Sequence, residues 1–416
     1  MILQQHHITP GIGQDRYQHQ FVITDIPLIK DLGQFICPKL VYNPFKFVVQ
    51  PAHKLNICIF EGGARLGKKL ASSGNGQGNI SNAEITQSNY HGGGKKLAFD
   101  IISRYKQVYK QLFYGKFTCD EKGRIYPAGR QASSLTDCLI AELSRGGVNV
   151  FTGVKVLEIR KGKNFTLKLS DGTVAEAKYA ALCAGGKAQK QFGTDGSSYA
   201  LAQSFGHKIT PLYPSLVQLK TDTTYIKTLR GIRADCVVKA LIGGKSVKES
   251  RGDVIFTEYG ISGNAVFYVS PVFAGNSGEV ILEFAPEFTE DELKEDIKIK
   301  QSLGYAESEL LSLTLNNQIG RAIIKRAGSS DAAKIARTAK NFTLPVLGTL
   351  GFDYAQVTRG GVDMRDIKQN LESSLCKNLY FAGEMLDVDG DCGGYNLTWA
   401  FASAACVAHS IAENEK

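Results

Sequence analysis

The segment Gly383–Asn396 carries the most specific chemical pattern in the chain. A strand predicted over 378–382 leads into it, and the pair Gly393-Gly394 precedes an apolar helix predicted over 397–412. Glycines leave room for a flat ligand beside a helix N-terminus, whose unpaired N–H groups carry positive partial charge. The segment also holds three acids within six residues, Glu384, Asp387 and Asp389. Together these features favour a ligand-binding site over an ordinary turn between a strand and a helix.

A second candidate site follows a short apolar strand predicted over 55–60, which ends at Glu61. An acid at such a tip accepts hydrogen bonds from a ribose in dinucleotide-binding units, although most acids at strand ends are simply solvated. The loop behind it, 61–82, is rich in glycine, and free backbone N–H groups there can form a nest for an anion. A flexible surface loop is the alternative interpretation. The candidate binding residues of this loop are Gly67, Lys68, Ser73, Gly74, Gly76, Gln77, Gly78 and Asn79.

A few other residues have types that support chemistry. Gly185 follows a buried strand predicted over 179–184 and allows a ligand to approach the backbone closely. His207 has a suitable pKa for a general base, but its sequence context is more typical of a helix end. Cys392 is a candidate for redox chemistry or for packing, and His409 lies on an apolar helix and is predicted to be structural. The sequence assigns no catalytic acid or base.

Composition limits the class of protein. The 416 residues favour two or three domains at about 150 residues each, and 43% hydrophobic with 21% charged residues excludes wholesale disorder. No apolar run approaches the ~18 residues that span a bilayer, and the N-terminus lacks a secretory signal pattern. Nine cysteines without a CxxC pair argue against a zinc ribbon and suit a reducing cytosol. From these features we expect a cytoplasmic protein with no membrane or metal partner. Because the net charge of +9 comes from dispersed Lys and Arg, we also expect no nucleic-acid partner.

The apolar patterning predicts an α/β fold with two domains. Strands and amphipathic helices alternate up to about residue 190, strands become short and turns frequent over 191–345, and the first texture returns afterwards. We therefore predict a discontinuous first domain over 1–190 and 346–416, and an inserted substrate-side domain over 191–345.

From about Leu55 to its C-terminus the chain resembles the HI0933-like, BaiN-type bacterial FAD-dependent oxidoreductases, relatives of the two-dinucleotide-binding-domain flavoproteins. The resemblance implies a Rossmann-like FAD-binding domain, discontinuous in sequence, with an inserted β-barrel and a helical piece that cover the flavin. It is carried by the segments Ile57–Glu61, Gly67–Leu70, Gly74–Asn79, Gly123–Pro127, Gly185–Lys187, Gly260–Gly263 and the run GEMLDVDGDCGGYNLTWAFASA from Gly383.

The resemblance also implies where FAD is held without a covalent bond. Glu61 would bind the adenosine ribose, the loop 74–79 would contact the cofactor, and Val154 or Val156 would lie beside the adenine. The residues implied at the ribityl chain and the ring are Gly383, Glu384, Asp389, Gly393, Gly394, Tyr395 and Asn396.

Two departures from the family pattern concern the cofactor. The family opens with a strand and a GxGxxG loop, expected about thirty residues before Glu61, whose helix N-terminus holds the pyrophosphate. The chain has Asp31-Leu32-Gly33-Gln34-Phe35 there, and Gly11-Ile12-Gly13 is only a partial echo further upstream. Since each charge-assisted hydrogen bond contributes roughly 1.5–3 kcal/mol, loss of these amides would weaken FAD binding by several kcal/mol. Gln77-Gly78 also stands where the family tends to have Arg-Cys, which removes a cation near the cofactor.

Three functions remain open from the sequence. The first is an FAD-dependent oxidoreductase in which hydride passes from NAD(P)H, a transient electron donor, through bound flavin to a small-molecule acceptor. The second is a non-catalytic scaffold of the same fold that has lost tight FAD binding together with the pyrophosphate fingerprint. The third, a nucleic-acid-binding protein, has no recognised module to support it. We predict the first, because the segment from Gly383 and the strand ending at Glu61 both fit it.

Overall fold

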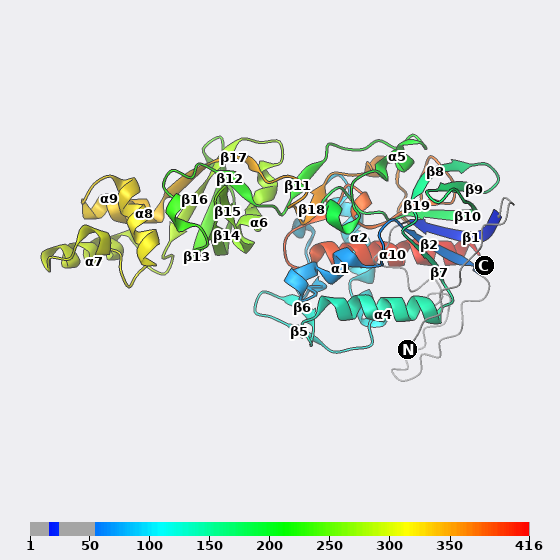
Figure 1. Ribbon diagram of the computed structural model, residues 1–416, viewed down its shortest axis with the longest axis horizontal. Coiled ribbons are helices and arrows are strands. Elements are labelled where there is room, and N and C mark those ends of the chain that lie inside the picture. Colours follow the sequence, from blue (N-terminus) through cyan, green and yellow to red (C-terminus); the bar gives the residue numbers. More distant parts are fainter. Residues whose placement is uncertain (1–15, 25–54, 416) are drawn as a thin grey trace.

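The computed structural model describes residues 16–24 and 55–415. The described chain is elongated, with a large sheet domain at one end, a barrel in the middle and a group of helices at the other end (Figure 1). Gly11–Gly13 and Asp31–Phe35, which we compared with the phosphate-binding loop of the family, lie outside the described residues.

A seven-stranded sheet forms the centre of the larger domain. Five parallel strands run in the order β7-β2-β1-β10-β19, and β9 and β8 extend the sheet antiparallel from the first half of β10. Their bounds are β1 Arg16–Thr24, β2 Ile57–Glu61, β7 Asn149–Thr152, β8 Val156–Lys161, β9 Phe165–Leu169, β10 Val174–Leu182 and β19 Leu379–Phe381. Because β19 joins this sheet from the far end of the chain, the domain is discontinuous, as the sequence predicted.

Helices and small sheets complete this domain. The C-terminal helix α10 packs against α2 and α3, and α1 packs against α4. The helices are α1 Lys68–Ala71, α2 Lys95–Tyr105, α3 Val108–Leu112, α4 Ala132–Arg145, α5 Tyr199–Gln203 and α10 Tyr395–Asn414. The small strands are β3 Ser81–Asn82, β4 Tyr90–His91, β5 Phe117–Cys119, β6 Arg124–Pro127 and β20 Asp389–Gly390. Within the described ranges, no helix has both the length and the apolar character needed to cross a bilayer.

The inserted domain is a closed six-stranded barrel with helices attached. The strand order is β12-β15-β14-β13-β16-β17, and α7 starts at a capping box in which Thr289 and Glu292 bond to each other's backbone N–H. The bounds are β12 Leu219–Thr221, β13 Arg233–Ile242, β14 Lys245–Phe256, β15 Gly260–Ser262, α6 Asn264–Val269, β16 Gly278–Phe284, α7 Glu290–Ser302, α8 Asn317–Ala327, α9 Ala332–Lys340 and β17 Phe342–Thr349. The predicted Rossmann-like domain with an inserted barrel and helical piece is confirmed.

Two hydrophobic cores mark the extent of the domains. The core of the inserted domain uses residues from Leu219 to Val346, whereas Tyr199–Gln203 (α5) packs into the core of the sheet domain. The predicted inserted span, 191–345, therefore begins too early, because the frequent turns after residue 190 belong to a segment that still covers the sheet.

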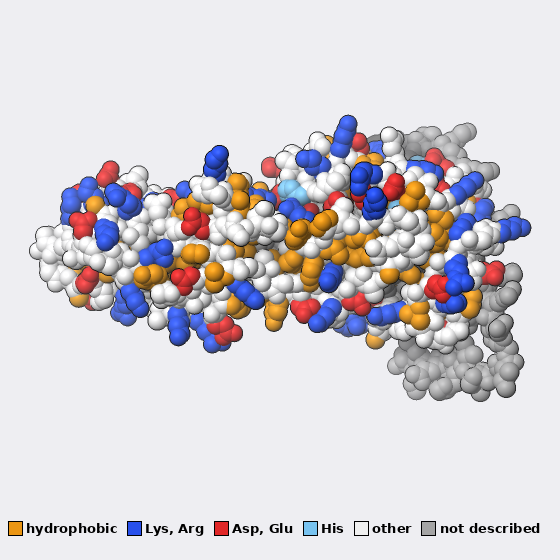
Figure 2. Space-filling model, turned by 90° about the horizontal axis from the view of Figure 1, so that it is seen from above, with side chains coloured by type: hydrophobic (Ala, Val, Ile, Leu, Met, Phe, Trp, Pro, Cys, Tyr) orange, Lys and Arg blue, Asp and Glu red, His pale blue; other side chains and the backbone are white. Residues whose placement is uncertain are grey.

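The chain crosses between the two domains twice, and the two crossings pair with each other. β11 (Tyr213–Ser215) and β18 (Val357–Arg359) form an antiparallel two-stranded ribbon between the barrel and the sheet domain (Figure 1). In the view of Figure 2, hydrophobic side chains gather over the middle of the molecule, and Lys and Arg are dispersed over both ends. The ribbon thus marks the junction of the two domains, and a site formed by both of them must lie beside it.

Candidate functional site

A cavity of about 890 Å³ lies at the junction of the two domains. On the sheet side it is lined by residues that follow the carboxyl ends of β2, β10 and β19, by the loop 67–79 and by the start of α10. Ligands in open α/β sheets bind at this edge of the strands. On the barrel side its lining residues come from β13, β14, β15 and α6 and are Arg233, Asp253, Ile255, Ser262, Gly263, Asn264 and Phe267.

Most of the residues predicted to bind a cofactor line this one cavity. They are Glu61, Gly67, Lys68, Ser73, Gly74, Gln77, Asn79, Gly185, Gly383, Glu384, Gly393, Gly394 and Asn396. The fold thus brings together the two segments that suggested chemistry from the sequence: the end of β2 and the start of α10. The resemblance implied that an inserted barrel covers the flavin, and Ser262 and Gly263 of its segment Gly260–Gly263 do line this cavity; the other barrel residues of the lining were not among the predicted site residues.

Five predicted residues are not among those that line the cavity: Gly76, Gly78, Val156, Asp389 and Tyr395. Gly78 lies against α4, where an added Cβ would be 3.1 Å from Cα of Ala132. Val156 begins β8 at the outer end of the sheet and pairs with Leu169. The ring of Tyr395 packs edge-on against the ring of Tyr90, with centroids 6.1 Å apart.

Asp389 was predicted to meet the ribityl chain, and the structure places it elsewhere. Its side chain is buried, Nε of Arg359 lies 3.2 Å from its Oδ1, and the hydroxyl of Ser215 donates to its Oδ2 at 3.2 Å. Both partners lie on the two-stranded ribbon. The carboxylate of Asp389 therefore joins the last loop of the sheet domain to the ribbon, and its neighbour Val388 lines the cavity instead.

Glu61 ends β2 at the cavity, and its Oε1 accepts a hydrogen bond from the N–H of Gly63 at 2.6 Å. That bond holds the carboxylate close to the turn that follows the strand. A carboxylate fixed in this way at a strand tip can accept the hydroxyl groups of a ribose. Glu61 thus lies in the cavity, and its role at the adenosine ribose stays a prediction.

Glu384 connects the two halves of the discontinuous domain. Its Oε2 accepts Nζ of Lys69 at 2.7 Å, and its Oε1 accepts the N–H of Thr358 at 2.8 Å. The side chains of Glu384 and Lys69 are 19% and 24% exposed, so the pair is partly shielded from solvent. The loop after β2 and the loop after β19 are therefore held together at the floor of the cavity.

The N-terminus of α10 is built from the two adjacent glycines. Gly394 is the N-cap with φ of 98°, and an added Cβ would lie 2.3 Å from the carbonyl oxygen of Ser81. No side chain caps this helix. The side chain of Asn396 instead holds the incoming loop, since it accepts from the N–H of Gly390 and donates to its carbonyl, both at 2.8 Å. The helix thus presents uncapped backbone N–H groups at the cavity.

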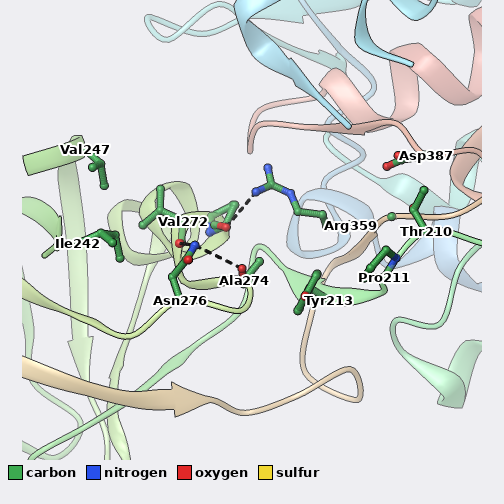
Figure 3. A pocket seen from close by; sticks show the side chains of 12 residues that line it. Thr210, Pro211, Tyr213, Ile242, Val247, Val272, Ala274, Asn276, Arg359 and Asp387 are labelled. Carbon is green, nitrogen blue, oxygen red and sulfur yellow. Dashed lines mark hydrogen bonds between the residues drawn. The ribbon is translucent and has the colours of Figure 1, made fainter. Parts of the chain in front are cut away.

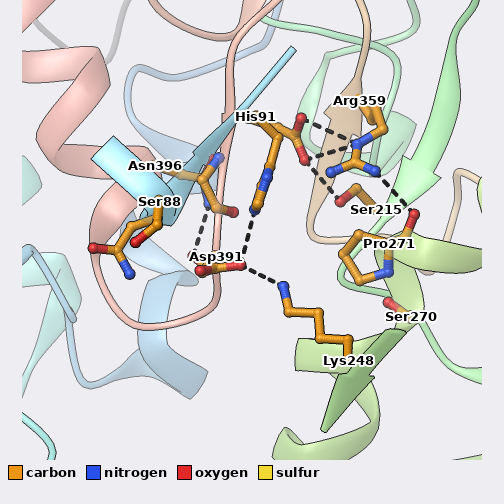
Figure 4. Close-up of polar contacts among 12 residues, drawn as sticks. Ser88, His91, Ser215, Lys248, Ser270, Pro271, Arg359, Asp391 and Asn396 are labelled. Atoms are coloured by element: carbon orange, nitrogen blue, oxygen red, sulfur yellow. Dashed lines mark hydrogen bonds and ion pairs between the residues drawn. The ribbon is translucent and has the colours of Figure 1, made fainter. Parts of the chain in front are cut away.

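Asp391, which the sequence did not single out, also lines the cavity. Nε2 of His91 and Nζ of Lys248 lie 3.0 and 2.7 Å from its Oδ1, in the network drawn in Figure 4. Burial acts to raise the pKa of this carboxyl, but the bonds from His91 and Lys248 outweigh it and hold the pKa below its usual value. Asp391 therefore stays a carboxylate. Its position three residues before the predicted Gly394 was the signal available in the sequence.

The remaining residues considered from the sequence do not form a catalytic group. His207 follows α5, is buried, and its Nε2 lies 2.7 Å from the hydroxyl of Ser373. Burial lowers its pKa, so the ring stays neutral, as suits a structural residue. Cys392 lines the cavity, and burial raises the pKa of its thiol, which disfavours the reactive thiolate. Among the described residues, no cluster of His, Cys, Asp and Glu could hold a metal ion.

A second cavity of about 490 Å³ lies beside the ribbon. Figure 3 shows its barrel wall, with Val247 and Val272, facing Arg359 of the ribbon and Asp387. The loop that carries Asp387 separates the two cavities, because the next residue, Val388, lines the large one. This second cavity therefore lies between the barrel, the ribbon and the sheet domain.

Asp387 makes stability depend on pH. Burial raises the pKa of this carboxyl, and the bond from the N–H of Gly93, 3.0 Å from Oδ2, only partly offsets it. The pKa of Asp387 is higher in the folded state than in the unfolded state, so protonation of Asp387 stabilises the fold. This stabilisation is complete below the ordinary pKa of about 3.9, and it is lost as the pH rises through the raised pKa. We expect Asp387→Asn to unfold at a higher temperature than the parent at neutral pH and at the same temperature near pH 3. An equal difference at both pH values, measured by calorimetry, would contradict this account.

Comparison with known proteins gives the following similarities. A sequence model described as the HI0933-like protein Rossmann domain matches residues 48–410. The chain is 34% identical over 383 residues to the 3-dehydro-bile acid delta(4,6)-reductase of Clostridium scindens, covering 86% of this chain and 93% of that protein. It is 26% and 25% identical to the Ribosomal RNA dihydrouridine synthases of Haemophilus influenzae and Escherichia coli, covering 86% of this chain and 92% of each. All three similarities extend over both domains.

Proposed function

Since the chain belongs to the HI0933-like family of Rossmann-domain proteins and is an FAD-dependent oxidoreductase, we propose that it transfers hydride from NAD(P)H to a carbon–carbon double bond of a small α,β-unsaturated carbonyl compound. The single observation that supports this most is the shared cavity, in which Glu61 and the glycine pair before α10 face one space closed by the barrel. Such a cavity can hold a cofactor and an acceptor together.

The residues present fit FAD. Gly383 has φ of 67°, and an added Cβ would contact only Cβ of Ala400, at 3.9 Å, so the side that faces the cavity is open. Glu61 offers a carboxylate for ribose hydroxyls, and the uncapped start of α10 offers N–H groups for the polar edge of a ring. When bound, FAD supplies the two-electron redox chemistry that no side chain here can perform. The chain would hold it through the loop 73–79 and the turns at Gly383 and Gly394.

The names of the relatives support this class of acceptor. The delta(4,6)-reductase name describes reduction of carbon–carbon double bonds, and dihydrouridine is uridine reduced at one carbon–carbon double bond. Both double bonds belong to conjugated carbonyl systems, which accept hydride at the carbon remote from the carbonyl and then take a proton from water at the carbon next to the carbonyl. The barrel side of the cavity supplies Ile255 and Phe267 as an apolar wall and Asn264 as a polar group. A flat, mainly apolar enone suits that wall.

The test is a sequence of measurements on the purified protein. We expect a visible flavin spectrum, loss of that absorbance on anaerobic addition of NADH or NADPH, and its return on addition of 4-androstene-3,17-dione or 2-cyclohexen-1-one. The saturated ketones of the same carbon skeletons are the control and should not restore it. If neither NADH nor NADPH reduces the flavin, the proposal that NAD(P)H is the electron donor is wrong. If the saturated ketones restore the absorbance equally well, the proposal that the acceptor is an enone is wrong.

A second candidate is supported by the other two relatives. Their names assign ribosomal RNA as the substrate, and they align with most of this chain. Reduction of a uracil base in RNA would use the same cavity but would contradict our prediction that the protein has no nucleic-acid partner. Mass spectrometry of ribosomal RNA from a deletion strain separates the two: loss of one dihydrouridine supports the RNA substrate, and unchanged RNA supports the small acceptor. The cytoplasmic location stays a prediction.

A further inference from the structure

The inserted domain is attached to the sheet domain by a thin connection. Within residues 16–24 and 55–415, the chain passes from one to the other only through the segments that contain β11 and β18, whose pairing runs from Tyr213 with Arg359 to Ser215 with Val357. A ribbon of two short strands has little stiffness of its own. Contacts away from the ribbon must therefore set the angle at which the barrel closes over the large cavity.

Lys248 makes such a contact. It lies on β14 of the barrel, and its Nζ reaches Oδ1 of Asp391 in the sheet domain at 2.7 Å (Figure 4). The side chains are 17% and 4% exposed, so water screens the pair weakly. The same ammonium lies 4.1 Å from the ring centroid of Tyr268, which restricts its position further.

A β-bulge aims this lysine. Ala240 pairs with Lys248 and Leu241 pairs with Ser246, so Val247 is an extra residue in β14. Val247 lines the second cavity, and Lys248 reaches the network beside the first. Because of this bulge, neighbouring residues of β14 reach opposite sides of the loop 387–394: Val247 lies at the second cavity, and Lys248 contacts Asp391.

Asp391 is fixed within the loop that leads to the glycine pair. Its backbone N–H donates to the carbonyl of Asn89 at 2.9 Å, and its carbonyl accepts the side-chain amide of Asn396 at 3.3 Å. His91 holds the same carboxylate oxygen from the sheet domain. Asp391 is therefore held in place by groups of the sheet domain that do not depend on Lys248.

We propose that Lys248 and Asp391 are positioning residues: their ion pair holds the barrel closed and sets the spacing between the acceptor-side wall and the start of α10. The proposal rests on the function proposed for the large cavity, in which the acceptor lies between Asn264 and Phe267 of the barrel and the glycine pair. With the lysine neutralised, the barrel turns about the ribbon, the acceptor loses one wall, and the sheet-domain residues around the cofactor stay in place.

The test compares Lys248→Met with Lys248→Arg in the FAD-loaded enzyme. Lys239→Met is the matched control, because Nζ of Lys239 lies 2.9 Å from Glu283 in an ion pair that stays within the barrel. We expect Lys248→Met to increase the radius of gyration in small-angle X-ray scattering, to raise the KM for 2-cyclohexen-1-one about tenfold with little change in kcat, and to leave the Kd for FAD nearly unchanged. Lys248→Arg should restore the parent values.

The outcomes separate this inference from the proposed function. If the parent enzyme does not reduce the enone, the scattering curves and the FAD titration still decide whether the ion pair closes the barrel. Scattering and KM values for Lys248→Met that match those of Lys239→Met would overturn the proposal. Equal loss of FAD and of thermal stability in Lys248→Met and Lys248→Arg would also overturn it, because the lysine would then serve the fold and not the closure.

Discussion

Replacing Ala400 by tryptophan is expected to lower the affinity for FAD by about a hundredfold or more while the protein still folds. Ala400 lies on the second turn of α10 and lines the large cavity opposite Gly383. Tryptophan is compatible with helical backbone, so the indole would occupy space meant for the ligand. Because overfilling a packed site costs about 1–3 kcal/mol, and more when ligand and side chain exclude each other, binding falls steeply. Titration of the apoprotein with FAD, followed by flavin fluorescence, measures the loss.

Ala400→Ser is the control for this experiment. Its hydroxyl adds little volume, and we expect FAD binding within a small factor of the parent. The thermal unfolding of both apoproteins should resemble that of the parent apoprotein. Stoichiometric FAD in the tryptophan variant would show that the cofactor does not use this cavity and would refute the site described here.

The second large effect concerns the start of α10. Gly394→Ala places a Cβ 2.3 Å from the carbonyl oxygen of Ser81 and forces alanine to a φ of 98°. Gly147 is the matched control, because it has φ of 66° but open space around an added Cβ. We expect Gly147→Ala to cost about 1–2 kcal/mol from strain alone, and Gly394→Ala to cost about 3–5 kcal/mol because a fixed backbone oxygen must also move.

Equilibrium unfolding in urea measures both free energies, and flavin absorbance of the folded fraction measures the site. Gly394→Ala should also lose bound FAD, since the glycine pair lines the cavity and would shift together with Ser81. Equal destabilisation in the two variants would mean that the contact with Ser81 relaxes without cost. The glycine would then be present for its backbone conformation alone.

Local pattern predicted the individual elements of this fold well. The strand predicted before Glu61 is β2, the strand predicted before Gly383 is β19, and the apolar helix predicted after the glycine pair is α10. Buried parallel strands are continuously apolar and helices show an apolar period of 3.6 residues, so both signals lie within a few neighbouring residues. The beginning of the inserted domain was less clear, because the turns after residue 190 resemble those of the barrel.

The site was predictable only in part. Glu61 and the segment from Gly383 carried family motifs and both reached the cavity. Asp389 carried the same motif but faces Arg359, and Asp391 was overlooked although Lys248 and His91 hold it at the cavity. In a loop of alternating acids, which carboxylate faces the ligand depends on partners far away in the chain, and the loop sequence alone contains no information about them.

What the sequence determined by itself is the chemistry available: an acid at a strand tip, glycines that bring backbone close to a ligand, and a helix start without a capping side chain. Only the tertiary structure decided that these groups share one cavity, through contacts such as that between Lys69 and Glu384, which are 315 residues apart. It also decided that a barrel closes the cavity and that Lys248 reaches Asp391 across the junction. The physical reason is that motifs act over a few bonds, whereas packing and ion pairs join residues that the chain connects only through its whole fold.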